Sequence, residues 1–144
     1  MSLRTLLQLN FGLAAYLTGL VWTVQLVVYP ALLLVGRAEF PRYHAAHTQG
    51  MGWAVGAPMV LELALAAWLA WAAYHAPHAT PALALTQLGL VLLIWVVTFF
   101  VSVPFHNRLA AHGYDYVVLD GLLRTNWLRT LAWTARLAVL WVMR

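Results

Sequence analysis

Long apolar runs constrain this chain more than any other feature of its sequence. Four of them extend over Leu6–Leu34, Gly52–Tyr74, Pro81–Val103 and Gly121–Met143. A helix of about 20 residues crosses the hydrocarbon core of a bilayer, and each run reaches that length. Only 8% of the residues are charged, whereas about a quarter are charged in soluble globular domains. We therefore predict an all-α fold, an integral membrane four-helix bundle in which residues 1–144 form a single transmembrane domain.

The connections between these runs differ in polarity. In the first connection, Phe40 and Pro41 precede two histidines, and a proline at this place predicts a short interfacial helix after the first span. The second connection, around residues 75–81, has no formal charge and is expected to be a tight turn.

Arginine is more frequent on one side of the predicted bundle than on the other. The first and third connections and their flanks hold Arg37, Arg42, Arg108 and Arg124, and the opposite side holds Arg4 and Arg144. Because positively charged loops stay in the cytoplasm, we predict a bacterial inner-membrane protein with both termini outside the cytoplasm.

Prolines interrupt or end three of the predicted spans, at Pro30, Pro58 and Pro104. Each removes a helix hydrogen bond and frees the carbonyl four residues earlier. These carbonyls belong to Leu26, Ala54 and Phe100. Irregular backbone at membrane depth is tolerated only where it is buried in protein or lines a water-filled cavity. The break at Pro104 therefore predicts a pocket in the cytoplasmic half of the bundle.

The last apolar run carries a stripe of polar side chains. At about 100° per residue, one face of a helix holds Asn126, Arg129, Thr130, Trp133 and Arg136. Charges inside a bilayer are costly and usually face a partner or a cavity, so this stripe predicts a functional site.

Glu62 is the only acidic residue within a predicted span. The helix rise of about 1.5 Å per residue places it at nearly the same depth as Gln25 and Arg129, in one polar layer. Glu62 is expected to pair with Arg129 or Arg136, either to build a binding site or only to fix helix register. Two arginines facing one glutamate leave one positive charge unpaired, and that charge needs a ligand, a lipid phosphate or water as its partner. We assign ligand binding to Gln25, Tyr29, Glu62, Trp133 and Arg136.

Histidines suggest a second kind of site. His44 and His47 share one helix face, and together with His106 they would offer three nitrogen ligands of the kind that zinc, copper or iron accepts. The alternatives are two interfacial histidines and a helix cap or general base at His106. Haem is less favoured than a metal ion because no predicted span has a central histidine.

Three segments, residues 44–48, 103–109 and 124–130, carry a resemblance to a known family. They resemble the small four-span membrane proteins of unknown function that are grouped with anthrone oxygenases. The resemblance implies a four-helix membrane bundle and cofactor-free oxygenation of an anthrone to an anthraquinone. It also implies that His106, Asn107 and Asn126 act as base and as donors to the developing enolate oxygen. We add Arg129 to this candidate catalytic set because it lies on the polar stripe.

These features lead to three alternative functions. The first is an enzyme that acts on an apolar phenolic or quinol-like small molecule and needs no cofactor. The second is a metal- or haem-binding membrane protein. The third is a non-catalytic packing protein that forms homo-oligomers through the GxxxG pattern of Gly52 and Gly56 and the small-residue face at Ala66, Ala67, Ala70 and Ala73.

Composition excludes several other classes. The chain has no cysteine and no lysine, so thiolate ligands, cysteine nucleophiles and Schiff-base lysines are ruled out. Its arginines are scattered at membrane edges rather than clustered on one basic surface, so nucleic acid is not expected as a partner. The expected partners are membrane lipid and an apolar small-molecule ligand.

Overall fold

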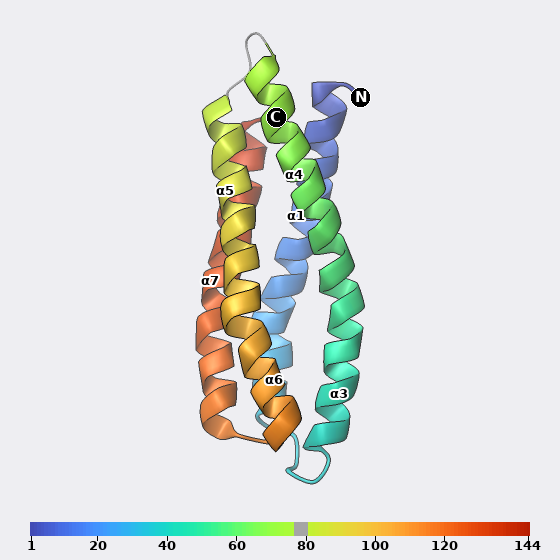
Figure 1. Cartoon of the computed structure of the whole chain (residues 1–144), viewed down its shortest axis with the longest axis vertical. Coiled ribbons are helices and arrows are strands. Elements are labelled where there is room, and N and C mark those ends of the chain that lie inside the picture. Colours follow the sequence, from blue (N-terminus) through green and yellow to red (C-terminus); the bar gives the residue numbers. More distant parts are fainter. Residues whose placement is uncertain (77–80) are drawn as a thin grey trace.

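The computed structural model describes residues 1–76 and 81–144, and most of these residues lie in helices, with no strand among them. In this part of the chain, four helical rods lie side by side along the long axis (Figure 1). The first rod comprises α1 (Leu3–Thr23), η1 (Val24–Val28) and α2 (Tyr29–Leu32), and the second comprises α3 (Phe40–Met51), η2 (Gly52–Gly56) and α4 (Ala57–His75). The third comprises α5 (Pro81–Val97), η3 (Thr98–Ser102) and α6 (Val103–His112), and the fourth is α7 (Tyr116–Val142). The predicted all-α fold is confirmed.

Three of the rods are long and apolar enough to cross a membrane. Within the described residues they are Leu3–Leu32, Phe40–His75 and Pro81–His112. The second and third predicted spans lie within them, and the first predicted span overlaps Leu3–Leu32 except for its last two residues. These helices support the prediction of an integral membrane protein. The fourth predicted span lies in α7, which is not among these three helices. Charged residues along α7 lower its hydropathy, namely Asp120, Arg124, Arg129 and Arg136.

The boundaries of two elements correct the predictions. A helix does begin at Phe40, beside Pro41, but it continues through η2 into α4, so the predicted separate interfacial helix is wrong. The fourth helix begins at Tyr116 rather than near Gly121, because the Asp115 side chain accepts hydrogen bonds from the first backbone N–H groups of α7. The predicted turn at residues 75–81 falls largely on residues 77–80, which lie outside the described residues.

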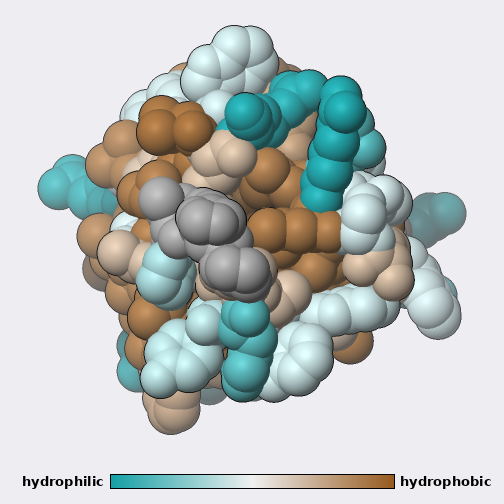
Figure 2. Space-filling model, turned by 90° about the horizontal axis from the view of Figure 1, so that it is seen from above, coloured by the Kyte–Doolittle hydropathy of each residue, from teal (hydrophilic) through white to brown (hydrophobic). Residues whose placement is uncertain are grey.

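The rods enclose a common core. α1 and α5 each pack against both α4 and α7, so the contacts run around a ring of four helices. Both termini lie at one end of the molecule (Figure 1). Large apolar side chains also cover the outside of the rods, among them Trp53, Trp71, Phe100, Leu131 and Trp141. Seen toward the end that holds the termini, hydrophobic residues fill much of the face and hydrophilic ones form separate groups (Figure 2). Such an exterior suits contact with lipid.

A π-helical turn precedes each of the three described prolines that lie away from the start of a rod. η1, η2 and η3 each end two residues before a proline, at Pro30, Pro58 and Pro104 respectively. In a π-helical turn, each backbone N–H group donates a hydrogen bond to the carbonyl five residues earlier. The N–H of Tyr29 donates to Val24, and the N–H of Val103 donates to Thr98. The wider turn moves backbone away from the proline ring, which would otherwise clash with the carbonyl four residues before it. Proline therefore widens these helices without ending them.

The backbone carbonyl of Ala54, which was predicted to be freed by Pro58, accepts a hydrogen bond from another helix. The Tyr16 hydroxyl of α1 donates a 3.1 Å hydrogen bond to the backbone oxygen of Ala54 in η2. This bond compensates for the intrahelical bond that Pro58 removes, and it links the first rod to the second.

Tyr16→Phe is expected to lower the free energy of unfolding by about 1 kcal/mol, because it leaves the Ala54 carbonyl without a donor. Reversible unfolding in detergent, followed by circular dichroism, measures the change. Tyr116→Phe is the matched control, since the Tyr116 hydroxyl is exposed and makes no hydrogen bond to the described residues. Equal stability of the two variants would contradict this role for Tyr16.

Candidate functional site

A cavity of about 550 Å³ lies beside all three π-helical segments. Val24 of η1, Val55 of η2 and Phe99 of η3 all line it. The volume suits a drug-sized ligand. Most of its wall is apolar and is formed by Leu17, Leu20, Val21, Val24, Met51, Val55, Met59, Val60, Trp95, Phe99 and Val103. A cavity therefore lies beside the break at Pro104, although its wall is mostly apolar, and residues of all three proline-associated turns line it.

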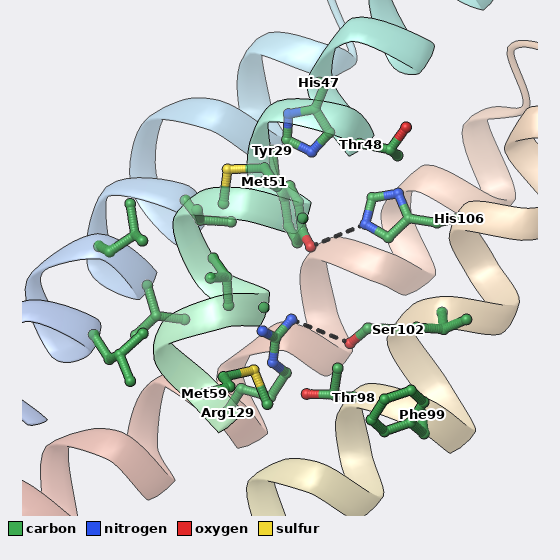
Figure 3. A pocket seen from close by; sticks show the side chains of 18 of the residues that line it. Tyr29, His47, Thr48, Met51, Met59, Thr98, Phe99, Ser102, His106 and Arg129 are labelled. Atoms are coloured by element: carbon green, nitrogen blue, oxygen red, sulfur yellow. Dashed lines mark hydrogen bonds between the residues drawn. The ribbon is translucent and has the colours of Figure 1, made fainter. Parts of the chain in front are cut away.

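Histidine and tyrosine side chains form one polar end of the cavity (Figure 3). The Tyr29 hydroxyl lies 3.3 Å from Nε2 of His106, and Nδ1 of His106 lies 3.0 Å from Nε2 of His44. Because α2, α3 and α6 each supply one of these residues, the chain of hydrogen bonds joins three rods. A neutral histidine has one donor and one acceptor nitrogen, so it can pass a proton along such a chain.

His47 lies beside this chain. Its ring is stacked 5.8 Å from the ring of His106, and the rings of His44 and His106 are stacked 5.3 Å apart. The three histidines predicted as metal ligands therefore come together. Among the described residues, however, no group of three or more His, Asp or Glu side chains is arranged to hold a metal ion.

Arg129 of α7 forms the other polar part of the cavity (Figure 3). Its guanidinium donates to the Ser102 hydroxyl and to the Asn126 side-chain oxygen, both at 3.4 Å. The guanidinium also lies 5.2 Å from the centre of the Trp133 ring. Its Nε is buried and makes no hydrogen bond to the described residues.

The charge on Arg129 has no acidic partner within the part of the chain that the structure describes. The two ion pairs found there are Arg124–Asp120 and Arg136–Glu62. Arg129 is only 7% exposed, and the two hydrogen bonds that it donates are long and go to neutral groups. A buried, unpaired cation of this kind favours an anionic or strongly polarised oxygen in the cavity.

Glu62 pairs with Arg136 in a separate cluster. Arg136 donates to Glu62 at 2.8 Å, to Asn10 at 2.9 Å and to Gln87 at 3.3 Å, so all four rods contribute. The indole N–H of Trp133 donates to both Glu62 oxygens at 3.1 Å. Glu62 and Arg136 are completely buried and do not line the cavity. The prediction of one polar layer is therefore wrong, because the polar groups form two.

Gln25 and Asn126 lie behind the cavity wall rather than on it. Asn126 donates to the Gln25 side-chain oxygen at 2.9 Å, and Gln25 donates to the backbone oxygen of Leu123 at 3.2 Å. Asn126 in turn accepts the hydrogen bond from Arg129. The two amides thus hold Arg129 in position, and neither contacts the cavity as predicted for a ligand-binding or catalytic group.

Four other residues predicted for the site line the cavity. Tyr29, Trp133, His106 and Asn107 line the cavity as expected. Asn10, Gln87 and Ser102 were missed by sequence reasoning. Each is an uncharged polar residue within a long apolar run, and its cost inside a bilayer is the signal that could have found it.

The glycines of the GxxxG pattern line the cavity instead of forming a close helix contact within the chain. A Cβ atom placed on Gly52 or Gly56 would meet no atom within 4 Å. Both glycines are among the residues that line the cavity. Their effect here is to leave room on the α4 side of the site.

Comparisons with known proteins add no assignment to this geometry: no protein-family model, curated protein or solved structure matches the chain.

Proposed function

We propose that this chain is a four-span membrane enzyme, similar to the anthrone oxygenases, that oxygenates an apolar phenolic or quinol-like molecule without a cofactor. The observation that carries the proposal is the pairing of His106 and Arg129 in one largely apolar cavity. His106 would act as the base through the Tyr29 hydroxyl that is hydrogen-bonded to it, and Arg129 would stabilise the resulting substrate anion.

The fourth span of this proposal is α7. Its polar residues face inward, where Asn126, Arg129 and Arg136 are buried, while Leu128, Leu131 and Trp141 are exposed on the outside. An inward polar stripe with an apolar exterior is how charged residues are accommodated in membrane helices. With four spans, the arginine-rich connections would face the cytoplasm of a bacterial inner membrane and both termini the other side.

The cavity suits the charge that such a reaction develops. Loss of a proton from an anthrone, or from a phenol, leaves a negative charge on an oxygen atom. The Arg129 guanidinium, which lines the cavity and has no acidic partner among the described residues, would donate hydrogen bonds to that oxygen. Apolar and aromatic side chains such as Phe99 and Met59 would contact the ring system.

The overall reaction balances without a cofactor. The substrate carbanion gives its electrons to dioxygen, one oxygen atom becomes the new carbonyl, and the other leaves as water with the two hydrogens of the original CH₂ group. The protein therefore needs only a base, an oxyanion partner and a dry cavity.

Purified protein in nanodiscs is expected to accelerate oxygen uptake by anthrone, and Gly56→Leu is expected to abolish that acceleration. The leucine side chain would extend into open space at the cavity wall and fill it. Oxygen uptake and the thermal unfolding temperature are measured together.

Gly19→Leu is the matched control, since a side chain at Gly19 also meets open space but Gly19 does not line the cavity. Wild-type protein that gives no more oxygen uptake than empty nanodiscs, with anthrone or with quinol probes, would contradict the proposed function.

A further inference from the structure

We propose that His44 relays protons between the cavity and a second hollow on the other side of its ring. The inference rests on the proposed function, because it concerns where the substrate proton goes after His106 has taken it. It assigns a role to a side chain that the oxygenation mechanism above does not use.

A second hollow of about 420 Å³ lies between α3 and α6. It is lined by Pro41, His44, Ala45, Thr48, Gln49 and Ala110. His44, Thr48 and Ala110 also line the larger cavity, so these three side chains separate the two spaces. Pro41, Ala45, Gln49 and Ala110 are exposed, which opens the second hollow to the outside.

The His44 ring is held firmly between the two spaces. It is only 2% exposed, and it stacks on Phe40 with ring centres 5.5 Å apart. Its Nε2 is hydrogen-bonded to Nδ1 of His106, and Nδ1 of His44 has no hydrogen-bond partner within the described part of the chain. A buried ring that contacts a base on one side and lines an open hollow on the other can conduct a proton out of the cavity.

The proton transfer balances at every group. A substrate O–H bond breaks and its proton goes to the Tyr29 oxygen, while the Tyr29 proton goes to Nε2 of His106. The Nδ1 proton of His106 passes to Nε2 of His44, and the Nδ1 proton of His44 passes to water in the second hollow. Each protein group gains one proton and loses one, and the substrate anion remains beside Arg129.

The same chain resets itself during oxygenation. When the O–O bond breaks and water leaves, one proton has to return to the cavity. Passage in the reverse direction supplies that proton and restores the starting tautomers of His44 and His106. The other ionisable groups that face these two rings are Tyr29 from α2, His47 from α3 and Arg129 from α7.

His47 does not take part in this chain. It lies one helical turn from His44 and stacks on His106, but its ring makes no hydrogen bond to the residues that the structure describes.

The test uses 2-hydroxyanthraquinone, whose absorption spectrum reports the ionisation of its hydroxyl group, bound to purified protein in nanodiscs. After a rapid upward pH jump at saturating probe concentration, His44→Phe is expected to slow ionisation of the bound probe about tenfold or more. Phenylalanine preserves the stacking on Phe40 and carries no proton. His112→Phe is the control, since His112 is exposed at the end of α6.

Rescue separates a relay from a structural role. His44→Ala removes the ring that separates the two spaces, so added imidazole is expected to restore fast ionisation of the probe in this variant. Imidazole is not expected to act in His44→Phe, where the phenylalanine ring occupies the place of the His44 ring. Ionisation at the wild-type rate in His44→Phe would overturn the relay. A metal ion that copurifies with wild-type protein and is lost in His44→Ala would overturn it as well. Oxygen uptake with anthrone tests the proposed function separately, because the pH jump needs only binding.

Discussion

Replacing Arg129 with methionine is expected to lower the rate of anthrone oxygenation by about a hundredfold or more, the usual cost of losing an oxyanion partner. Methionine keeps most of the length and apolar volume of the side chain but removes the charge. The free energy of unfolding is expected to stay the same or to rise, because Arg129 is a buried cation that contacts only neutral acceptors at 3.4 Å. Oxygen uptake and denaturant unfolding in detergent measure the two effects.

Opposite changes in rate and stability would distinguish a functional arginine from a structural one. Arg124→Met is the matched control, since Arg124 lies on the same helix with a side chain that is 77% exposed and paired with Asp120. That control is expected to leave both quantities close to wild type. If Arg129→Met unfolded the protein more readily and kept its rate, Arg129 would be a packing residue.

Glu62→Leu is expected to reduce the free energy of unfolding by about 3–5 kcal/mol, since it leaves the buried Arg136 charge without a counter-ion. Glu62 and Arg136 are both fully buried, and the remaining partners of Arg136 are the neutral side chains of Asn10 and Gln87. Unfolding in detergent with increasing denaturant measures the loss.

Two further variants show whether the loss comes from the unpaired charge. The double variant Glu62→Leu with Arg136→Met is expected to regain most of the stability, because no charge is left in the core. Asp120→Asn, which breaks the exposed pair in the same helix, is expected to cost at most about 1 kcal/mol. A double variant as unstable as Glu62→Leu would show that the ion pair itself holds the rods together.

The polar stripe of the last helix could be predicted from sequence because helical periodicity alone determines it. Asn126, Arg129, Thr130, Trp133 and Arg136 are all buried in the structure, as the stripe requires. Charge in an apolar run has few stable orientations, so an inward direction follows from composition and period.

The partners within the stripe could not be predicted in the same way. Counting residues from the ends of the predicted spans placed Glu62 at nearly the depth of Arg129, and the choice between Arg129 and Arg136 as its partner depends on a few ångströms. The spans begin earlier than predicted in α3 and α7, and π-helical turns change the rise and rotation of three rods. Asn10 and Gln87, which complete the shell around Arg136, carry no charge and so gave little signal.

The prolines illustrate both the reach and the limit of sequence reasoning. Proline chemistry predicted that carbonyls would be freed, and Ala54 has indeed bonded to Tyr16. It did not predict that Pro30, Pro58 and Pro104 would each follow a π-helical turn, nor that the three turns would surround one cavity. That outcome depends on how the rods pack, because their heights are set by tertiary contacts.

Direct observation of a bound ligand would test the central claim, which is that the cavity holds a phenolic ring system between His106 and Arg129. The measurement is a structure of the protein in lipid with 2-hydroxyanthraquinone. The account predicts density within the cavity, with one ligand oxygen in hydrogen-bonding distance of the Arg129 guanidinium and a hydroxyl directed at Tyr29 and His106. Ligand density only on the lipid-facing surface, with the cavity filled by protein side chains, would contradict it.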